Sequence, residues 1–293
     1  MNFSTLVLQS VVGISYGMDL FIAALGITLI FGVARVINFA HGAFYAVGAY
    51  ACFTLTSWLA DVPANFWLAL LIGPVVVAII GALAELFIIR RFYAREHLEQ
   101  ILLMYAIAII LGDVILITYG GMERSVATPA IFAGALPFAG LYLPQYRLFL
   151  ILLGLVMALG VWLLLNKTKI GSITRAAASH PEMANALGIN VPIVFTGIFM
   201  LGCWLAGIGG VLISPLEAIW PGMGMHVVVL SFIIVVIGGG GTIGGCLLAS
   251  LIVGLVQSLG ILFLPRFAMI FIYGVMIIIL LFRPQGLMGR PVH

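Results

Sequence analysis

The sequence predicts an all-α fold, a bundle of membrane-crossing helices with about eight or nine membrane elements, at least one of them broken or re-entrant. The composition carries this prediction: 64% of the residues are hydrophobic, only 7% are charged, and the mean hydropathy is +1.31. About a quarter of the residues of a soluble domain are charged, and they supply much of its surface. A soluble enzyme and a disordered chain are therefore excluded, and residues 1–293 are expected to form one transmembrane domain.

Apolar segments of span length supply most of the predicted elements, because crossing the hydrocarbon core takes about 20 mostly apolar residues. The stretch at 5–34 contains Asp19 and is either one long tilted helix or a surface helix followed by a span. Further spans are predicted at 43–60, 66–89, 100–119, 147–165, 191–213 and 242–264, and a shorter one at 267–282. Residues 226–237 are too few to cross and precede four glycines, so we expect a broken or re-entrant element there.

The basic residues predict how the bundle is oriented. One set of alternate loops holds nine of the 12 lysines and arginines: Arg35, Arg90, Arg91, Arg95, Lys167, Lys169, Arg175, Arg283 and Arg290. The opposite set holds Arg124, Arg147 and Arg266. Because positively charged loops stay in the cytoplasm, we expect the 166–190 loop and the C-terminus to be cytoplasmic and residues 120–146 to lie outside.

Small residues at four-residue spacing predict helix faces that pack tightly against their neighbours. Examples are Gly202, Ala206 and Gly210; Ser250, Gly254 and Ser258; and Gly13 with Gly17. The alternative is that one such face slides against, or opens from, the neighbouring helix. The single cysteines Cys52, Cys203 and Cys246 are expected to pack as small hydrophobic residues, with neither a metal site nor a disulfide. A net charge of +3 without a basic run makes nucleic acid an unexpected partner.

Polar residues inside apolar spans are candidates for function, because a charge at the bilayer centre costs about 2.5–3.5 kcal/mol on insertion scales. Glu85 precedes two arginines and is expected to be interfacial. Asp113 is deeper, and a structural hydrogen bond or ion pair and a pathway role are equally open. The role of Asp19 depends on where the first helix begins. His41, close to Asn38, is expected to pack or cap a helix rather than relay protons.

A glycine-rich segment at 239–244 matches the pattern GxGxxG. A dinucleotide site would require a preceding strand and a following helix in a βαβ unit, whereas the flanks here are membrane segments. We therefore interpret the segment as a close-packed break between helices.

The most informative polar segment runs from Lys167 to Asn190. Ser179 and Glu182 fit a capping box, with Pro181 in the first turn of the predicted helix. Met183 and Leu187 then share one helix face, and Gly188 stands where helices commonly end. Such a short helix is unstable alone and needs a surface to dock against. The chain has no GxxxxGK[ST] motif, so ATP would have to be bound by separate subunits, and no cofactor is expected in this chain.

Several motifs in order along the chain carry a family resemblance. They are LGITLIFG at 25–32 followed by NFAHG at 38–42, PEMA at 181–184 with LGIN at 187–190, GG at 238–239 with GTIG at 241–244, and RPQGL at 283–287. In these the sequence resembles permease subunits of branched-chain amino acid ABC importers, the hydrophobic amino acid uptake family. The resemblance implies a permease of the bacterial inner membrane, paired with a second homologous permease, two ABC ATPase subunits and a periplasmic substrate-binding protein.

By this resemblance, the polar segment would couple the permease to its ATPases. The residues expected to do so are Arg175, Ala176, Pro181, Glu182, Met183, Ala184, Leu187, Gly188, Ile189 and Asn190. The NFAHG motif would lie near the translocation path. Together with the acidic residues and the glycine break, the candidates for that path are Asn38, His41, Gly42, Asp19, Asp113, Gly239, Gly241 and Thr242.

Two departures from the family pattern keep alternatives open. His180 stands where the family usually has Asn or Asp, which leaves its contact with the ATPase open. Asp19 stands where the family has an apolar or small residue, which leaves the solute open. Urea, short amides and organic acids therefore remain alternative solutes. A stand-alone channel or ion-coupled carrier, with a cation at Asp113 or Asp19, is the alternative of another class. An intramembrane enzyme is disfavoured, since no paired nucleophile and base stand out within the spans.

Overall fold

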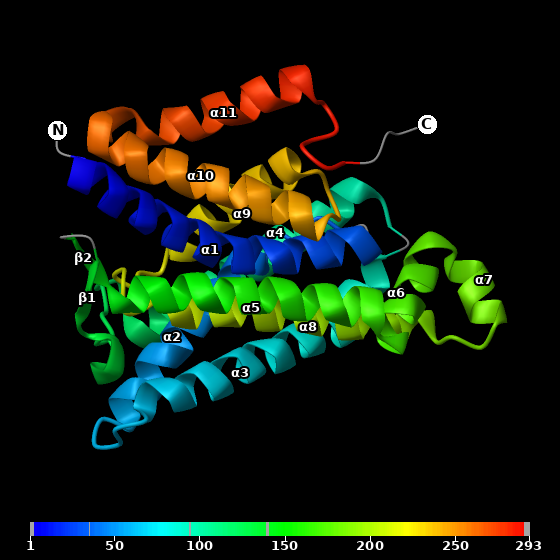
Figure 1. The fold of residues 1–293 in the computed structure, drawn as a ribbon. Helices are drawn as coiled ribbons and strands as arrows, with labels where there is room; N and C mark the ends of the chain where they lie inside the picture. Colours follow the sequence, from blue (N-terminus) through cyan, green and yellow to red (C-terminus); the bar gives the residue numbers. More distant parts are fainter. Residues whose placement is uncertain (1–2, 35, 94, 139–140, 290–293) are drawn as a thin grey trace.

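A computed structural model describes residues 3–34, 36–93, 95–138 and 141–289 (Figure 1). Its helices are α1 (Phe3–Ala34), α2 (His41–Trp58), α3 (Asn65–Phe87), α4 (His97–Tyr119), α5 (Gln145–Lys167), α6 (Lys169–Ser179), α7 (Pro181–Ala186), α8 (Val191–Ile213), α9 (Met223–Gly238), α10 (Ile243–Phe263) and α11 (Ala268–Phe282). Short 3₁₀ turns occur at η1 (Ile89–Phe92), η2 (Ala130–Phe132) and η3 (Pro265–Phe267). The predicted all-α class is confirmed, with one short β-hairpin in addition.

Seven of these helices are long and apolar enough to cross a membrane: α1, α3, α4, α5, α8, α10, and α11 together with η3. The 5–34 stretch is one continuous helix, which decides between the two readings of that segment. The predicted element at 226–237 is the 16-residue helix α9, and its re-entrant path stays a prediction.

Helix α1 forms the centre of the bundle. It packs against α5, α8, α9 and α10, and its residues 20–25 are fully buried. In α1, 78% of the most apolar stretch is buried, whereas the value for α4 and for α5 is 17%. The exposed side chains of the outer helices are mostly apolar, as expected for surfaces that contact lipid or another subunit.

Glycines allow these helices to approach closely, as the small-residue spacing predicted. A Cβ atom added at Gly13 would lie 2.9 Å from the carbonyl oxygen of Gly254, and one at Gly17 would lie 2.7 Å from that of Ser250. On α8, a Cβ at Gly202 would lie 2.6 Å from the side chain of Ile30. Van der Waals packing of this kind is the main attraction between helices in lipid.

The bundle has two distinct ends (Figure 1). One carries an antiparallel hairpin of β1 (Ala135–Phe138) and β2 (Leu141–Pro144), in a segment for which the sequence indicated no strands. The other carries α6 and α7. We call these the hairpin end and the α7 end. Arg90 and Thr196 are hydrogen-bonded, which places η1 beside the start of α8 at the α7 end. Arg35 and Arg290 of the basic set lie outside the described residues.

Candidate functional site

The predicted polar segment forms two helices rather than one, and the break between them corrects the expected capping box. Ser179 is the last residue of α6, and His180 occupies the N-cap of α7 without a side-chain capping bond. The physical reason is Pro181, which disfavours helical geometry in the residue before it. His180 accordingly has φ −141° and ψ 76°, and the new helix starts at the proline.

Helix α7 exposes apolar side chains at the end of the bundle. The exposed fractions of Met183 and Leu187 are 64% and 77%. On the opposite face of α7, Ala184 is buried against Ala177 of α6 and Val191 of α8. Pro181 and Glu182 are also exposed. We call Pro181, Glu182, Met183 and Leu187 the α7 surface.

The remaining residues expected to couple to an ATPase lie around this surface. Arg175 donates a hydrogen bond to the Leu165 carbonyl, which attaches α6 to the end of α5, and another to the Ser172 hydroxyl within α6. Gly188 has φ +85°, a conformation suited to glycine that reverses the chain after α7. Ala176 is exposed and Ile189 is half-buried. The Asn190 side chain accepts a hydrogen bond of 3.3 Å from the Ile193 amide and thereby caps α8.

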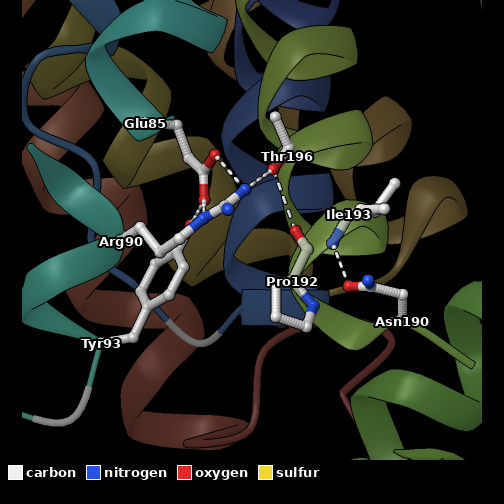
Figure 2. Close-up of polar contacts among 7 residues, drawn as sticks. All are labelled: Glu85, Arg90, Tyr93, Asn190, Pro192, Ile193 and Thr196. Carbon is white, nitrogen blue, oxygen red and sulfur yellow. Dashed lines mark hydrogen bonds and ion pairs between the residues drawn. The ribbon is translucent and has the colours of Figure 1, made fainter. Parts of the chain in front are cut away.

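Glu85 holds the end of α3 to the start of α8 (Figure 2). Its side chain is fully buried and accepts two hydrogen bonds of 3.3 Å from Arg90 and one of 3.1 Å from the Tyr93 hydroxyl. Arg90 also donates to Thr196, whose hydroxyl donates to the Pro192 carbonyl at 2.9 Å. Glu85 and Arg90 therefore form a structural brace, and the expected interfacial position of Glu85 stays a prediction.

Asp19 is buried in the core between α1 and α2. It is 1% exposed, and its Oδ2 accepts a hydrogen bond of 2.7 Å from the Tyr45 hydroxyl. Its Oδ1 has no partner among the described residues. Asp19 therefore lies away from any surface of this chain, and a pathway role for it stays a prediction.

The start of α2 lies beside the middle of α1. His41 Nε2 is 2.9 Å from the carbonyl oxygen of Ala23. Ala23 precedes the end of α1 by about 16 Å, at 1.5 Å per residue, so the chain turns back along α1 before α2 begins. Asn38, in this returning stretch, is fully buried, and neither of its side-chain amide atoms has a partner in the described part of the chain. His41 packs against α1, as expected.

The first turn of α9 contacts the first turn of α2, which itself lies beside the middle of α1. A Cβ at Gly42 would lie only 1.9 Å from the Gly224 carbonyl oxygen, so only glycine allows this crossing. Beside it, α2, α4 and α9 enclose a cleft of about 310 Å³. Its walls include Phe39, Ala43, Gly112, Asp113, Pro221, Gly222, Gly224, Met225 and Val228. The PGMG run at 221–224 was not among the predicted site residues, although its proline and glycines signal the interruption before α9.

Asp113 is exposed in this chain and forms no hydrogen bond or ion pair among the described residues. The structural bond that was one reading of Asp113 is therefore absent within the described chain. Of the predicted path residues, Asp113 lines this cleft and Gly42 contacts its wall residue Gly224.

The glycine break joins α9 to α10 at the α7 end, away from this cleft. Gly239 and Gly241 have φ +88° and +83°. A Cβ at Gly239 would lie 2.4 Å from the Gly289 amide nitrogen, so the turn is packed tightly on the C-terminal tail. The Thr242 hydroxyl donates to the Gly239 carbonyl at 2.8 Å. The expected close-packed break is confirmed.

Cys52, Cys203 and Cys246 are buried and free, as expected for cysteines that pack as small hydrophobic residues. Within the described ranges, no group of three or more His, Cys, Asp or Glu side chains is placed to hold a metal ion.

Comparison with known proteins identifies the family. Residues 10–280 match the family described as branched-chain amino acid transport system, permease component. The chain is 28% identical to the high-affinity branched-chain amino acid transport system permease protein BraD of Pseudomonas aeruginosa, over 97% of this chain and 95% of that protein. It is 28% identical to the corresponding Escherichia coli permease protein LivH, over 95% and 94%.

An archaeal relative, the probable branched-chain amino acid transport permease protein LivH of Methanocaldococcus jannaschii, is 31% identical over 94% of this chain and 90% of that protein. No solved structure matches the chain significantly. The family match covers most of the chain, including both the α6–α7 segment and the cleft. The chain therefore belongs to the permease components of branched-chain amino acid transport systems, and it is a multi-pass membrane transport subunit rather than an enzyme.

Proposed function

We propose that this chain is the permease subunit of a bacterial inner-membrane ABC importer that moves branched-chain or other amino acids into the cytoplasm. Two ATPase subunits would bind ATP and drive transport, a second homologous permease would complete the path, and a periplasmic binding protein would deliver the solute. The family, the printed descriptions of its relatives and the lack of a P-loop motif in the sequence support this assignment.

The observation that carries the proposal is the α7 surface. Met183 on α7 and Leu187 directly after it are two large exposed apolar side chains, at the end of the bundle where the described basic clusters gather. Basic loops favour the cytoplasm, so this end would face the ATPases, with the C-terminus on the same side. An apolar helix face of this kind fits a hydrophobic groove in a partner protein.

The contacts of α7 provide a route by which movement could reach the bundle. Ala184 joins α7 to both α6 and α8, and Arg175 joins α6 to α5. Helix α8 in turn packs against α1, α2 and α3. A nucleotide-driven shift of α7 would therefore act on α8, which packs directly against the central helix α1.

The test is to place a charge on the α7 surface. Leu187→Arg or Met183→Arg should abolish ATP-dependent uptake in the reconstituted complex, because arginine cannot enter an apolar groove without a partner for its charge. Membrane insertion should remain normal, since both side chains are exposed. Met122→Arg is the matched control, because Met122 is 69% exposed and follows α4 toward the other end. Normal uptake by both α7 variants would contradict the docking role.

The alternatives are separated by two simple measurements. Gradient-driven flux through the purified chain alone in liposomes would favour a channel or an ion-coupled carrier over an ABC permease. Competition of labelled leucine uptake by urea, a short amide or an organic acid would assign one of those solutes instead.

A further inference from the structure

The exposed position of Asp113 shows that its surroundings cannot be lipid alone. Its neighbours on α4 include Ile110, Val114 and Ile117, with exposed fractions of 59%, 54% and 84%. A carboxylate with no partner in the described chain is costly next to lipid, and acidic groups in spans face a bundle interior or a water-filled cavity. The cleft at Asp113 should therefore be filled by water or by a polar ligand.

The wall opposite α4 has the complementary electrostatic character. The first turns of α2 and α9 meet at Gly42 and Gly224. Neither helix has a side chain capping its N-terminus. Backbone carbonyls that precede the two helices accept from the His41, Met223 and Met225 amides, and the remaining first-turn N–H groups and the helix dipoles leave partial positive charge there. An anionic group is favoured at such paired helix starts, whereas a cation is favoured at Asp113.

A buried polar group beside the cleft also lacks a partner. Asn38 is fully buried, precedes the wall residue Phe39, and leaves both the oxygen and the nitrogen of its amide without hydrogen bonds in the described ranges. Asn38 does not itself line the cleft; because an unsatisfied buried amide is unfavourable, water or a polar group that reached it past Phe39 would be stabilising. The rest of the wall is apolar, with Phe39, Met225 and Val228 among its side chains.

We infer that the cleft between α2, α4 and α9 holds the solute as a zwitterionic α-amino acid, with its ammonium group at Asp113 and its carboxylate toward the starts of α2 and α9. The apolar wall accommodates an aliphatic side chain. This inference rests on the proposed function and deepens it, because urea, simple amides and organic acids lack one or both of the charges that the cleft complements.

Transport by the complete complex tests the role of the carboxylate. The assay uses proteoliposomes that contain both permeases, both ATPases and the binding protein. In these, Asp113→Asn should lower the maximal rate of L-leucine uptake at least about tenfold, which corresponds to the loss of one hydrogen bond to a charged group. Asp113→Glu should restore part of the rate, which a purely structural role would not predict. Uptake at the wild-type rate by Asp113→Asn would overturn the inference and leave the proposed function standing.

A steric variant tests the cleft without touching the charge. A Cβ at Gly112 has open space around it, and Gly112 lines the cleft, so Gly112→Leu should narrow the cleft and slow uptake. Gly160→Leu on α5 is the matched control, because its Cβ also has open space. Equal uptake by the two variants would contradict the assignment.

Thiol labelling tests solute contact independently of transport. The three native cysteines are buried, so Asp113→Cys provides the reactive thiol for a cationic methanethiosulfonate reagent. We expect labelling of Asp113→Cys in membranes and at least a threefold slower reaction in saturating L-leucine. Ile117→Cys, on the same helix, should show no protection. Absence of labelling, or labelling that leucine leaves unchanged, would overturn the inference; protection combined with no ATP-driven uptake by the complex of native sequence would instead refute the importer function.

Discussion

Removing Arg90 from the buried pair with Glu85 should destabilise the bundle strongly. In Arg90→Met, the fully buried carboxylate of Glu85 keeps only the hydrogen bond from Tyr93. Breaking a buried pair by removing one partner costs about 3–5 kcal/mol. The Arg90 side chain is 34% exposed, so solvent already screens the pair and the lower figure, about 3 kcal/mol, applies.

A second substitution distinguishes the energetic cost of the unpaired buried charge from the cost of the lost Arg90 contacts. Glu85→Gln combined with Arg90→Met removes both charges and leaves a neutral amide in the same place. The double variant should be more stable than Arg90→Met alone by at least about 1 kcal/mol, because no uncompensated carboxylate remains. Arg91→Met is the control, since Arg91 is exposed and has no ion pair among the described residues.

The buried cysteines provide the assay. Cys52, Cys203 and Cys246 are shielded in the folded bundle and become accessible to a thiol-reactive fluorophore when it unfolds. Heating each purified variant in mild detergent should give the lowest midpoint for Arg90→Met, an intermediate one for the double variant, and the wild-type value for Arg91→Met. Equal midpoints for Arg90→Met and the double variant would refute the argument from buried charge.

Two further predictions use the same purified material. Gly42→Ala should lower the unfolding midpoint, because the new Cβ would lie 1.9 Å from the Gly224 carbonyl oxygen. Such overpacking costs about 1–3 kcal/mol. Gly160→Ala is the control and should leave the midpoint unchanged, because a Cβ at Gly160 has open space around it. Asn190→Ala removes the cap of α8 at a cost of about 1 kcal/mol, so amide hydrogen exchange should accelerate at Ile193; unchanged exchange there would argue against the cap.

Local sequence rules located the helices well because a chain that crosses lipid has few alternatives to an α-helix. The span predicted at 191–213 coincides with α8 (Val191–Ile213), and the other long spans agree within a few residues at most ends. Backbone groups in lipid must be satisfied within the helix, so apolar length determines where a helix lies. The capping rule failed at Ser179, where the constraint that Pro181 places on His180 prevailed.

The polar candidates show what the sequence left undetermined. Asp19, Glu85 and Asp113 are all acidic residues in apolar helices, yet the first bonds to Tyr45 in the core, the second pairs with Arg90, and the third is exposed at a cleft. For Glu85 the partner Arg90 is only five residues away, whereas nothing near Asp19 or Asp113 in the sequence distinguishes their outcomes, because the partner of Asp19 comes from another helix and Asp113 has none in the described chain.

By itself, the sequence determined that the chain is a bundle of membrane helices with an exposed apolar helix among its basic loops. Hydrophobic length and local breakers are properties of contiguous residues, so a linear pattern records them. Only the tertiary structure decided that α2 and α9 begin against each other beside Asp113. That arrangement depends on how closely Gly42 and Gly224 let two distant segments approach, and such contacts are fixed by packing in three dimensions.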